Sequence, residues 1–173
     1  LACRKAKNLK FEEAAALFSG VSDPAFTYDF VGNHGPLQNP EFETFARNEN
    51  ARQWSKKKFF QAMAGLSAKI KAGNAQAEEE YRYALGLYNI SHFGSWWILV
   101  DDFWSISFPD RTAQKNLLKE ARIHFIQSAE KSSDREKAAR SYYMSALVSR
   151  LETRAGENEE ESSNFGNSVS VLF

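Results

Sequence analysis

The chain has 173 residues, 43% hydrophobic and 25% charged, values typical of one globular domain with a sizeable core. Its 22 basic and 22 acidic residues leave no net charge that would favour nucleic acid or an anionic membrane. The single cysteine, Cys3, excludes an intrachain disulfide and a cysteine-only metal site. No apolar run approaches the about 20 residues of a membrane-spanning helix.

The first part of the chain predicts two short helices and then an irregular insertion. Helices are expected over 1–8 and 11–19, and Gly20 is expected to end the second. Residues 21–50 form the insertion, because prolines and glycines interrupt any regular pattern there. Within it, the rings of Phe26, Tyr28 and Phe30 alternate as in a strand or one more helical turn, and residues 41–50 fit a short polar helix.

Two longer helices are predicted next, over 53–72 and 75–92. The first has an apolar stripe at helical spacing, and Gly73 followed by Asn74 is expected to form a tight turn that makes the two helices antiparallel. Asn74 is expected to cap the second helix. The stripes are Phe59, Ala62, Met63, Leu66 and Ile70 in the first helix, and Tyr81, Ala84, Leu85, Tyr88 and Phe93 in the second.

The stretch 77–104 has the densest group of aromatic residues in the chain. Gly94 is expected to end one helix, and residues 96–104 are expected to return as a helix buried on two sides. A loop over 105–110 would follow. The stretch therefore predicts the place where two helix pairs meet.

The last third predicts a long helical hairpin. A helix over 113–131 has the ridge Leu117, Ala121, Phe125 and Ala129. Ser133 and Glu136 fit a capping box for a last helix that ends near Thr153. That helix is expected to be buried through Ala139, Tyr142, Ala146 and Leu147. Residues 154–173 are expected to be an acidic linker and tail.

Alternation of small and large residues at offsets of three and four suggests a helical repeat. Phe11, Ala14 and Phe18 follow this pattern, and so do Ala121, Phe125 and Ala129, as in the second helix of a tetratricopeptide repeat. We therefore expect an all-α fold of antiparallel helix pairs in a tetratricopeptide-like right-handed solenoid. Its domain would span 1–153, and the chain would be a fragment of a larger protein.

The segment from Tyr83 to Trp97 also resembles one that recurs in large tetratricopeptide-like helical proteins of Bacteroidota. In those proteins it reads Leu-Gly-x-x-Tyr-Tyr-Asn-x-x-Tyr-Tyr-Gly-Asn, and this chain departs from it at Ser95, where Asn would stand. The similarity covers about residues 54–152. It implies a helical fold and a periplasmic or outer-membrane-associated location, and it implies no catalytic residue.

The best candidate site combines acids with tryptophans. Its residues are Trp96, Trp97, Asp101, Asp102 and Trp104. Carboxylates beside indole rings could act as general acids, and the rings could stack on sugars. The competing reading places the rings in the core, since neighbouring acids on a helix point about 100° apart and cannot share a proton.

Other constellations have weaker patterns. His34, His92 and His124 are far apart in sequence, so no metal site is expected, and His124 is expected at the edge of its helix. Lys56, Lys57 and Lys58 are expected to be a solvated helix face. The sequence contains neither a phosphate-binding glycine loop nor a nucleophile elbow.

These patterns favour a scaffold or adaptor that binds a protein or peptide partner and is not an enzyme. No cofactor, nucleic acid or transmembrane segment is expected. The alternative is a glycan-binding or glycan-processing helical domain that uses the Trp/Asp cluster at 96–104. A purely structural segment of a larger chain is the third possibility.

Overall fold

The computed structural model describes residues 1–22, 34–39, 54–101 and 111–169, with Arg111 and 156–169 described as backbone only. Within these ranges the fold is all-helical, as predicted, and contains no strand. The expectations for 23–33, 40–53 and 102–110 lie outside the described residues. They include most of the insertion at 21–50, the polar helix at 41–50 and the loop at 105–110.

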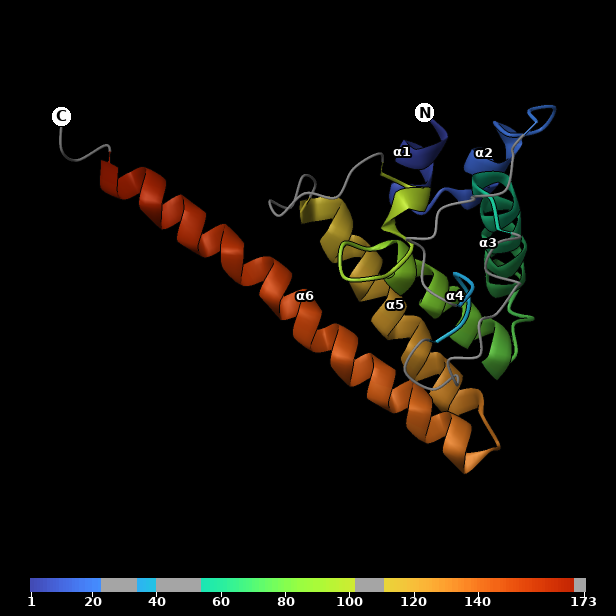
Figure 1. Ribbon diagram of the computed structural model, residues 1–173. Coiled ribbons are helices and arrows are strands. Elements are labelled where there is room, and N and C mark those ends of the chain that lie inside the picture. Colours follow the sequence, from blue (N-terminus) through green and yellow to red (C-terminus); the bar gives the residue numbers. More distant parts are fainter. Residues whose placement is uncertain (23–33, 40–53, 102–110, 170–173) are drawn as a thin grey trace.

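Six α-helices and one short 3-10 helix make up the described fold (Figure 1). Each α-helix contacts its neighbours along the chain, and α1 also touches α5. One continuous hydrophobic core runs from Ala6 to Ala155. The elements are α1 (Ala2–Lys7), α2 (Phe11–Ala16), α3 (Lys56–Lys71), α4 (Ala77–Ile90), η2 (Trp97–Leu99), α5 (Arg111–Lys131) and α6 (Arg135–Val169).

The turn between α3 and α4 forms at Gly73, where the sequence predicted it. Gly73 has a φ of +71°, a left-handed conformation that glycine adopts without strain, and its N–H donates to Ile70. The predicted cap at Asn74 is wrong, because α4 begins three residues later. Glu79 Oε2 instead accepts the Gln76 N–H at 2.8 Å.

Helix α4 lies at the centre of the molecule, and its residues are buried on almost every side. It packs against α3 on one side and α5 on the other. Gly86 makes the first contact close, since a Cβ there would lie 2.3 Å from the Met63 sulfur. The predicted inner positions Ala84 and Leu85 are buried, and so are Tyr83, Leu87 and Ile90.

The expected return helix over 96–104 is wrong in its described part. The chain folds back on the end of α4, because the Trp96 N–H donates to the Asn89 carbonyl at 2.8 Å. After this contact only residues 97–99 are helical, in a single 3-10 turn. The Asp101 N–H donates to the Trp97 carbonyl at 3.0 Å.

Helices α5 and α6 form the predicted antiparallel hairpin, and α6 extends far beyond the other helices (Figure 1). The ridge of Leu117, Ala121, Phe125 and Ala129 is buried as predicted. The predicted capping box is wrong, since Asp134 Oδ1 accepts the Glu136 N–H at 2.9 Å. The helix end near Thr153 is also wrong, because α6 continues to Val169. The division into a domain and a linker at 153 stays a prediction.

The prediction of which face of α6 is buried is wrong, and it is the main error in the predicted helix orientations. Ala139 and Ala146 are exposed, Tyr142 is 50% exposed and Leu147 is half-buried. The buried row is Ser141, Met144, Ser145 and Val148 instead. Two serines thus face α5, and an aromatic residue faces outward.

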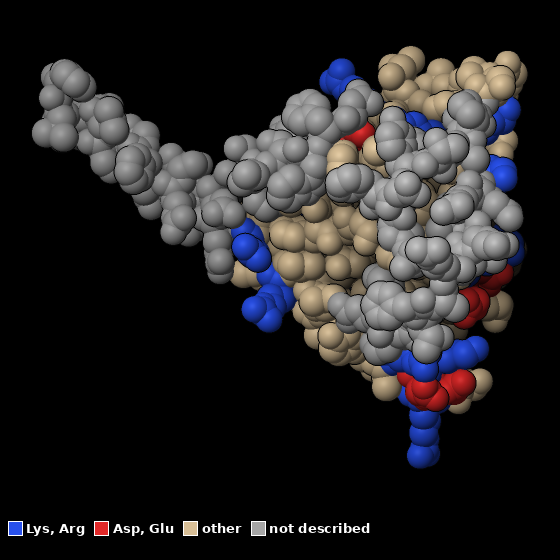
Figure 2. Space-filling model, in the orientation of Figure 1, with Lys and Arg blue, Asp and Glu red and all other residues tan. Residues whose placement is uncertain are grey.

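In the part of the chain that the structure describes, no helix is both long and apolar enough to span a bilayer. On the face in Figure 2, described acidic and basic residues lie next to one another at the lower end. They do not form an extended area of one sign there.

Candidate functional site

The structure describes three of the five residues of the predicted Trp/Asp cluster. Trp96 has no exposed area, and its Nε1 donates to the His34 carbonyl at 3.1 Å. A fully buried ring presents no face to a ligand. Trp97 is half-buried at the start of η2, and Asp101 forms an ion pair with Lys7 of α1. Asp102 and Trp104 lie outside the described residues.

The three histidines lie in different surroundings, and the structure does not gather them. Burial lowers the pKa of His34 and of His92 below their ordinary value, and for His92 the nearby Asp101 charge partly opposes this pKa shift. His124 is buried, so its expected position at a helix edge is wrong. No group of three potential metal ligands occurs within the described ranges.

His124 belongs to a buried polar link between α4 and α5 that the sequence did not reveal. Glu80, only 2% exposed, accepts from His124 Nδ1 at 2.7 Å and from Lys131 Nζ at 2.5 Å. The ring of Tyr83 packs edge-on against His124 at 4.9 Å, and burial raises the pKa of Tyr83 to about 12. The carboxylate is closed off from solvent, so this link fixes two helices and offers no open reaction site.

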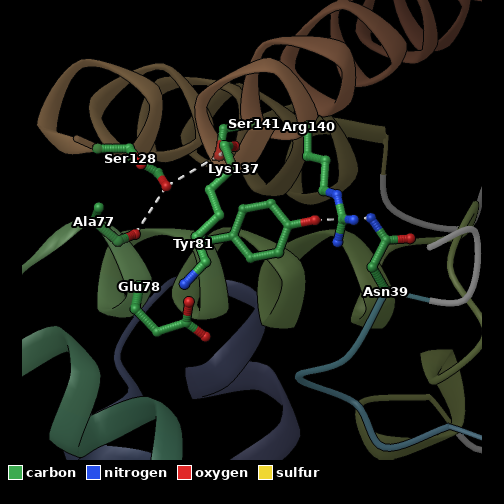
Figure 3. A pocket seen from close by; sticks show the side chains of 9 residues that line it. Asn39, Ala77, Glu78, Tyr81, Ser128, Lys137, Arg140 and Ser141 are labelled. Carbon is green, nitrogen blue, oxygen red and sulfur yellow. Dashed lines mark hydrogen bonds between the residues drawn. The ribbon is translucent and has the colours of Figure 1, made fainter. Parts of the chain in front are cut away.

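A pocket of about 180 Å³ opens beside this link, between α4, α5, α6 and the segment 34–39 (Figure 3). The ring of Tyr81 forms one wall, and its hydroxyl accepts from Asn39 Nδ2 at 2.9 Å. Glu78 and Lys137, both exposed, add one negative and one positive charge to the lining. The lining residues are Asn39, Ala77, Glu78, Tyr81, Ser128, Ser132, Lys137, Arg140 and Ser141.

Two buried serine hydroxyls form the floor of this pocket. Ser128 Oγ donates to the Ala77 carbonyl at 2.8 Å, and Ser141 Oγ donates to the Lys137 carbonyl at 2.9 Å. The two Oγ atoms also lie 3.1 Å apart. Each hydroxyl has one proton, and with both protons donated to carbonyls the two oxygens keep acceptor lone pairs. The floor therefore favours a ligand that donates hydrogen bonds.

The outward face of α6 is a second candidate surface. Ala139, Tyr142 and Ala146 follow one another at spacings of three and four, so they lie in one row on the helix. This small–large–small row has the pattern of a helix-packing ridge, yet it is exposed. Between residues 135 and 155, α6 contains five basic and two acidic residues.

Sequence reasoning missed both the pocket and the outward row. The pocket combines residues from four segments, which no local spacing reveals. The row was visible in the sequence, but its direction was assigned inward. Comparison with protein-family models, with curated proteins and with solved structures finds no match to this chain.

Proposed function

We propose that this chain is a non-catalytic scaffold that binds a helix of a protein partner on the outward face of α6. The observation that carries the proposal is the exposed row of Ala139, Tyr142 and Ala146. Small residues let a second helix approach closely, and a ring between them fills the space beside it. The tyrosine presents a large rigid contact area, as anchor residues of interfaces do.

The arrangement of the helices supports a tetratricopeptide-like stack as the architecture of this scaffold. Among the described elements, contacts join α1 to α2, α2 to α3, and so on to α6. A stack of this kind leaves its terminal helix with one face uncovered, and a further helix can extend it. A right-handed solenoid remains part of the proposal.

Charge indicates the kind of helix that would bind. The basic excess of α6 between residues 135 and 155 complements an amphipathic helix with acidic residues beside its apolar row. The resemblance to Bacteroidota proteins adds a periplasmic or outer-membrane-associated assembly as the setting. The absence of catalytic motifs from the sequence supports a role without turnover. The glycan alternative has less support, since Trp96 is part of the core.

The test begins with capture of partners by the intact chain, followed by affinity measurement with one purified partner. Ala146→Glu places a charge in the row, whereas Leu17→Glu places one at another exposed site and serves as control. We expect Ala146→Glu to raise the Kd at least about tenfold, or 1.4 kcal/mol. Leu17→Glu should leave the Kd unchanged. Both variants should unfold near the wild-type temperature.

If Ala146→Glu and Leu17→Glu bind the partner with equal affinity, the outward face of α6 is not the interface. A substrate turned over by the purified chain in a broad hydrolase screen would contradict the scaffold itself. Tyr142→Ala should weaken binding without loss of stability, because half of this side chain is already in solvent.

A further inference from the structure

The lining of the pocket beside Tyr81 includes one acidic and one basic side chain that make no ion pair with any described residue. Arg140 of the lining pairs with Glu136, and nearby Glu79 and Glu80 pair with Lys69 and Lys131. Glu78 and Lys137 line the same pocket from α4 and α6 (Figure 3). In the part of the chain that the structure describes, neither side chain makes an ion pair or a hydrogen bond.

This pair sets a requirement on any ligand. An anion bound at Lys137 would lie near the carboxylate of Glu78, and a cation bound at Glu78 would lie near the ammonium of Lys137. Each arrangement adds a repulsion between like charges. A molecule that has an ammonium group and a carboxylate close together avoids both repulsions. The pocket is therefore matched to a zwitterion.

The volume of the pocket and the serine hydroxyls on its floor narrow the class of ligand further. A volume of about 180 Å³ lies below the roughly 300–1,000 Å³ of pockets for drug-sized ligands. A pocket of this size has room for a small molecule only. The hydroxyls of Ser128 and Ser141 offer acceptor lone pairs to a donor group on that molecule.

We propose that this pocket binds a small polar α-amino acid as its free zwitterion. The ammonium group pairs with Glu78 and the carboxylate pairs with Lys137. A short side chain with a hydroxyl group donates to the serine oxygens of the floor, beside the ring of Tyr81. The site goes beyond the proposed partner interface, which uses the outward row of α6.

The test is calorimetric titration of the intact chain with L-serine. We expect saturable binding with a Kd of about 1 mM or tighter. N-acetyl-L-serine lacks the ammonium charge, and L-serine methyl ester lacks the carboxylate. Each derivative should bind at least about tenfold more weakly than L-serine.

Variants assign the binding to the two charges. Glu78→Gln and Lys137→Gln should each weaken L-serine binding at least about tenfold. Lys119→Gln neutralises an exposed lysine of α5 outside the pocket and should bind as the wild type does. All three positions are exposed, so thermal unfolding should not change.

No saturable heat with L-serine up to about 10 mM would overturn the proposal, as would equal binding of either derivative. Unchanged binding in both Glu78→Gln and Lys137→Gln would exclude this pocket as the site. These results are independent of the partner interface, because Ala146 and Leu17 do not line the pocket.

Discussion

Gly94 lies against the last turn of α4 with no room for a side chain. A Cβ there would lie 2.4 Å from the carbonyl oxygens of Tyr88 and Asn89. These are backbone atoms, so relief requires movement of the helix end that also holds the Trp96 N–H. We expect Gly94→Ala to lower the free energy of unfolding by about 2 kcal/mol, measured by urea denaturation.

Gly65 provides the matched control for that substitution. It lies exposed within α3, and a Cβ there would meet nothing within 4 Å. Alanine is the better helix former by about 1 kcal/mol, so Gly65→Ala should be neutral or stabilising. A Gly94→Ala variant as stable as wild type would contradict the close packing of Gly94 against the end of α4.

Glu12 joins α2 to α3 and makes stability depend on acid pH. Its Oε1 accepts from Lys71 Nζ at 2.6 Å and from Ser67 Oγ at 3.0 Å. Burial raises the pKa of Glu12, but these hydrogen bonds and a backbone N–H together lower it below its ordinary value of 4.5. The folded state thus binds fewer protons than the unfolded state.

The sign of the pH effect follows from that lowered pKa. The contribution of Glu12 is fully present above pH 4.5 and is lost as pH falls toward the folded pKa. Between about pH 5 and 3, the free energy of unfolding should fall less steeply in Glu12→Gln than in wild type. Glu130→Gln, at an exposed position of α5, should keep the wild-type slope. Parallel slopes in all three proteins would contradict the role given to Glu12.

At the scale of elements, the sequence predicted where helices lie better than which way they face. The helices α3, α4 and α5 have long apolar stripes or a terminal glycine, and their predicted positions are correct to within about three residues at each end. Helix α6 has two small-residue rows, and the row with tyrosine is the more apolar. The row that is buried is the one with Ser141 and Ser145, because small side chains let α6 lie close to α5.

The buried polar link beside the pocket was harder to predict, for a different reason. Glu80 looks like one of three acids at a helix N-terminus, where acids normally face solvent. Its spacing of four and seven from buried Ala84 and Leu87 does place it on the inner face. Its partners His124 and Lys131 lie 44 and 51 residues away in sequence, so no local pattern reveals them.

The buried link at Glu80 should contribute strongly to the contact between α4 and α5. Glu80→Gln keeps the shape but replaces two charge-assisted hydrogen bonds with weaker ones. Hydrogen bonds to charged groups contribute roughly 1.5–3 kcal/mol, so we expect a loss of about 2 kcal/mol in urea denaturation. Lys131 is 41% exposed and can be hydrated again, which limits the loss. A variant with wild-type stability would show that the link specifies packing without stabilising it.

For the whole molecule, the question is whether the helices unfold together or one pair at a time. A stack in which each helix touches only its neighbours can open from one end. Here α1 also touches α5. The Lys7–Asp101 ion pair and the hydrogen bond from the Cys3 thiol to the Leu99 carbonyl further join α1 to η2 and the residues that follow it. The core is continuous from α1 to α6. We therefore expect one cooperative unit.

Val148→Ala in α6 tests this cooperativity at a distance. The side chain has no exposed area, and removal of two methyl groups should cost about 2 kcal/mol. If the molecule opens as one unit, the slowest amides of α1 and α2 should exchange about 30-fold faster, as those of α6 do. Hydrogen exchange read by mass spectrometry separates these segments. Acceleration confined to α5 and α6 would show instead that the hairpin opens alone, and that the contacts of α1 do not couple the two ends.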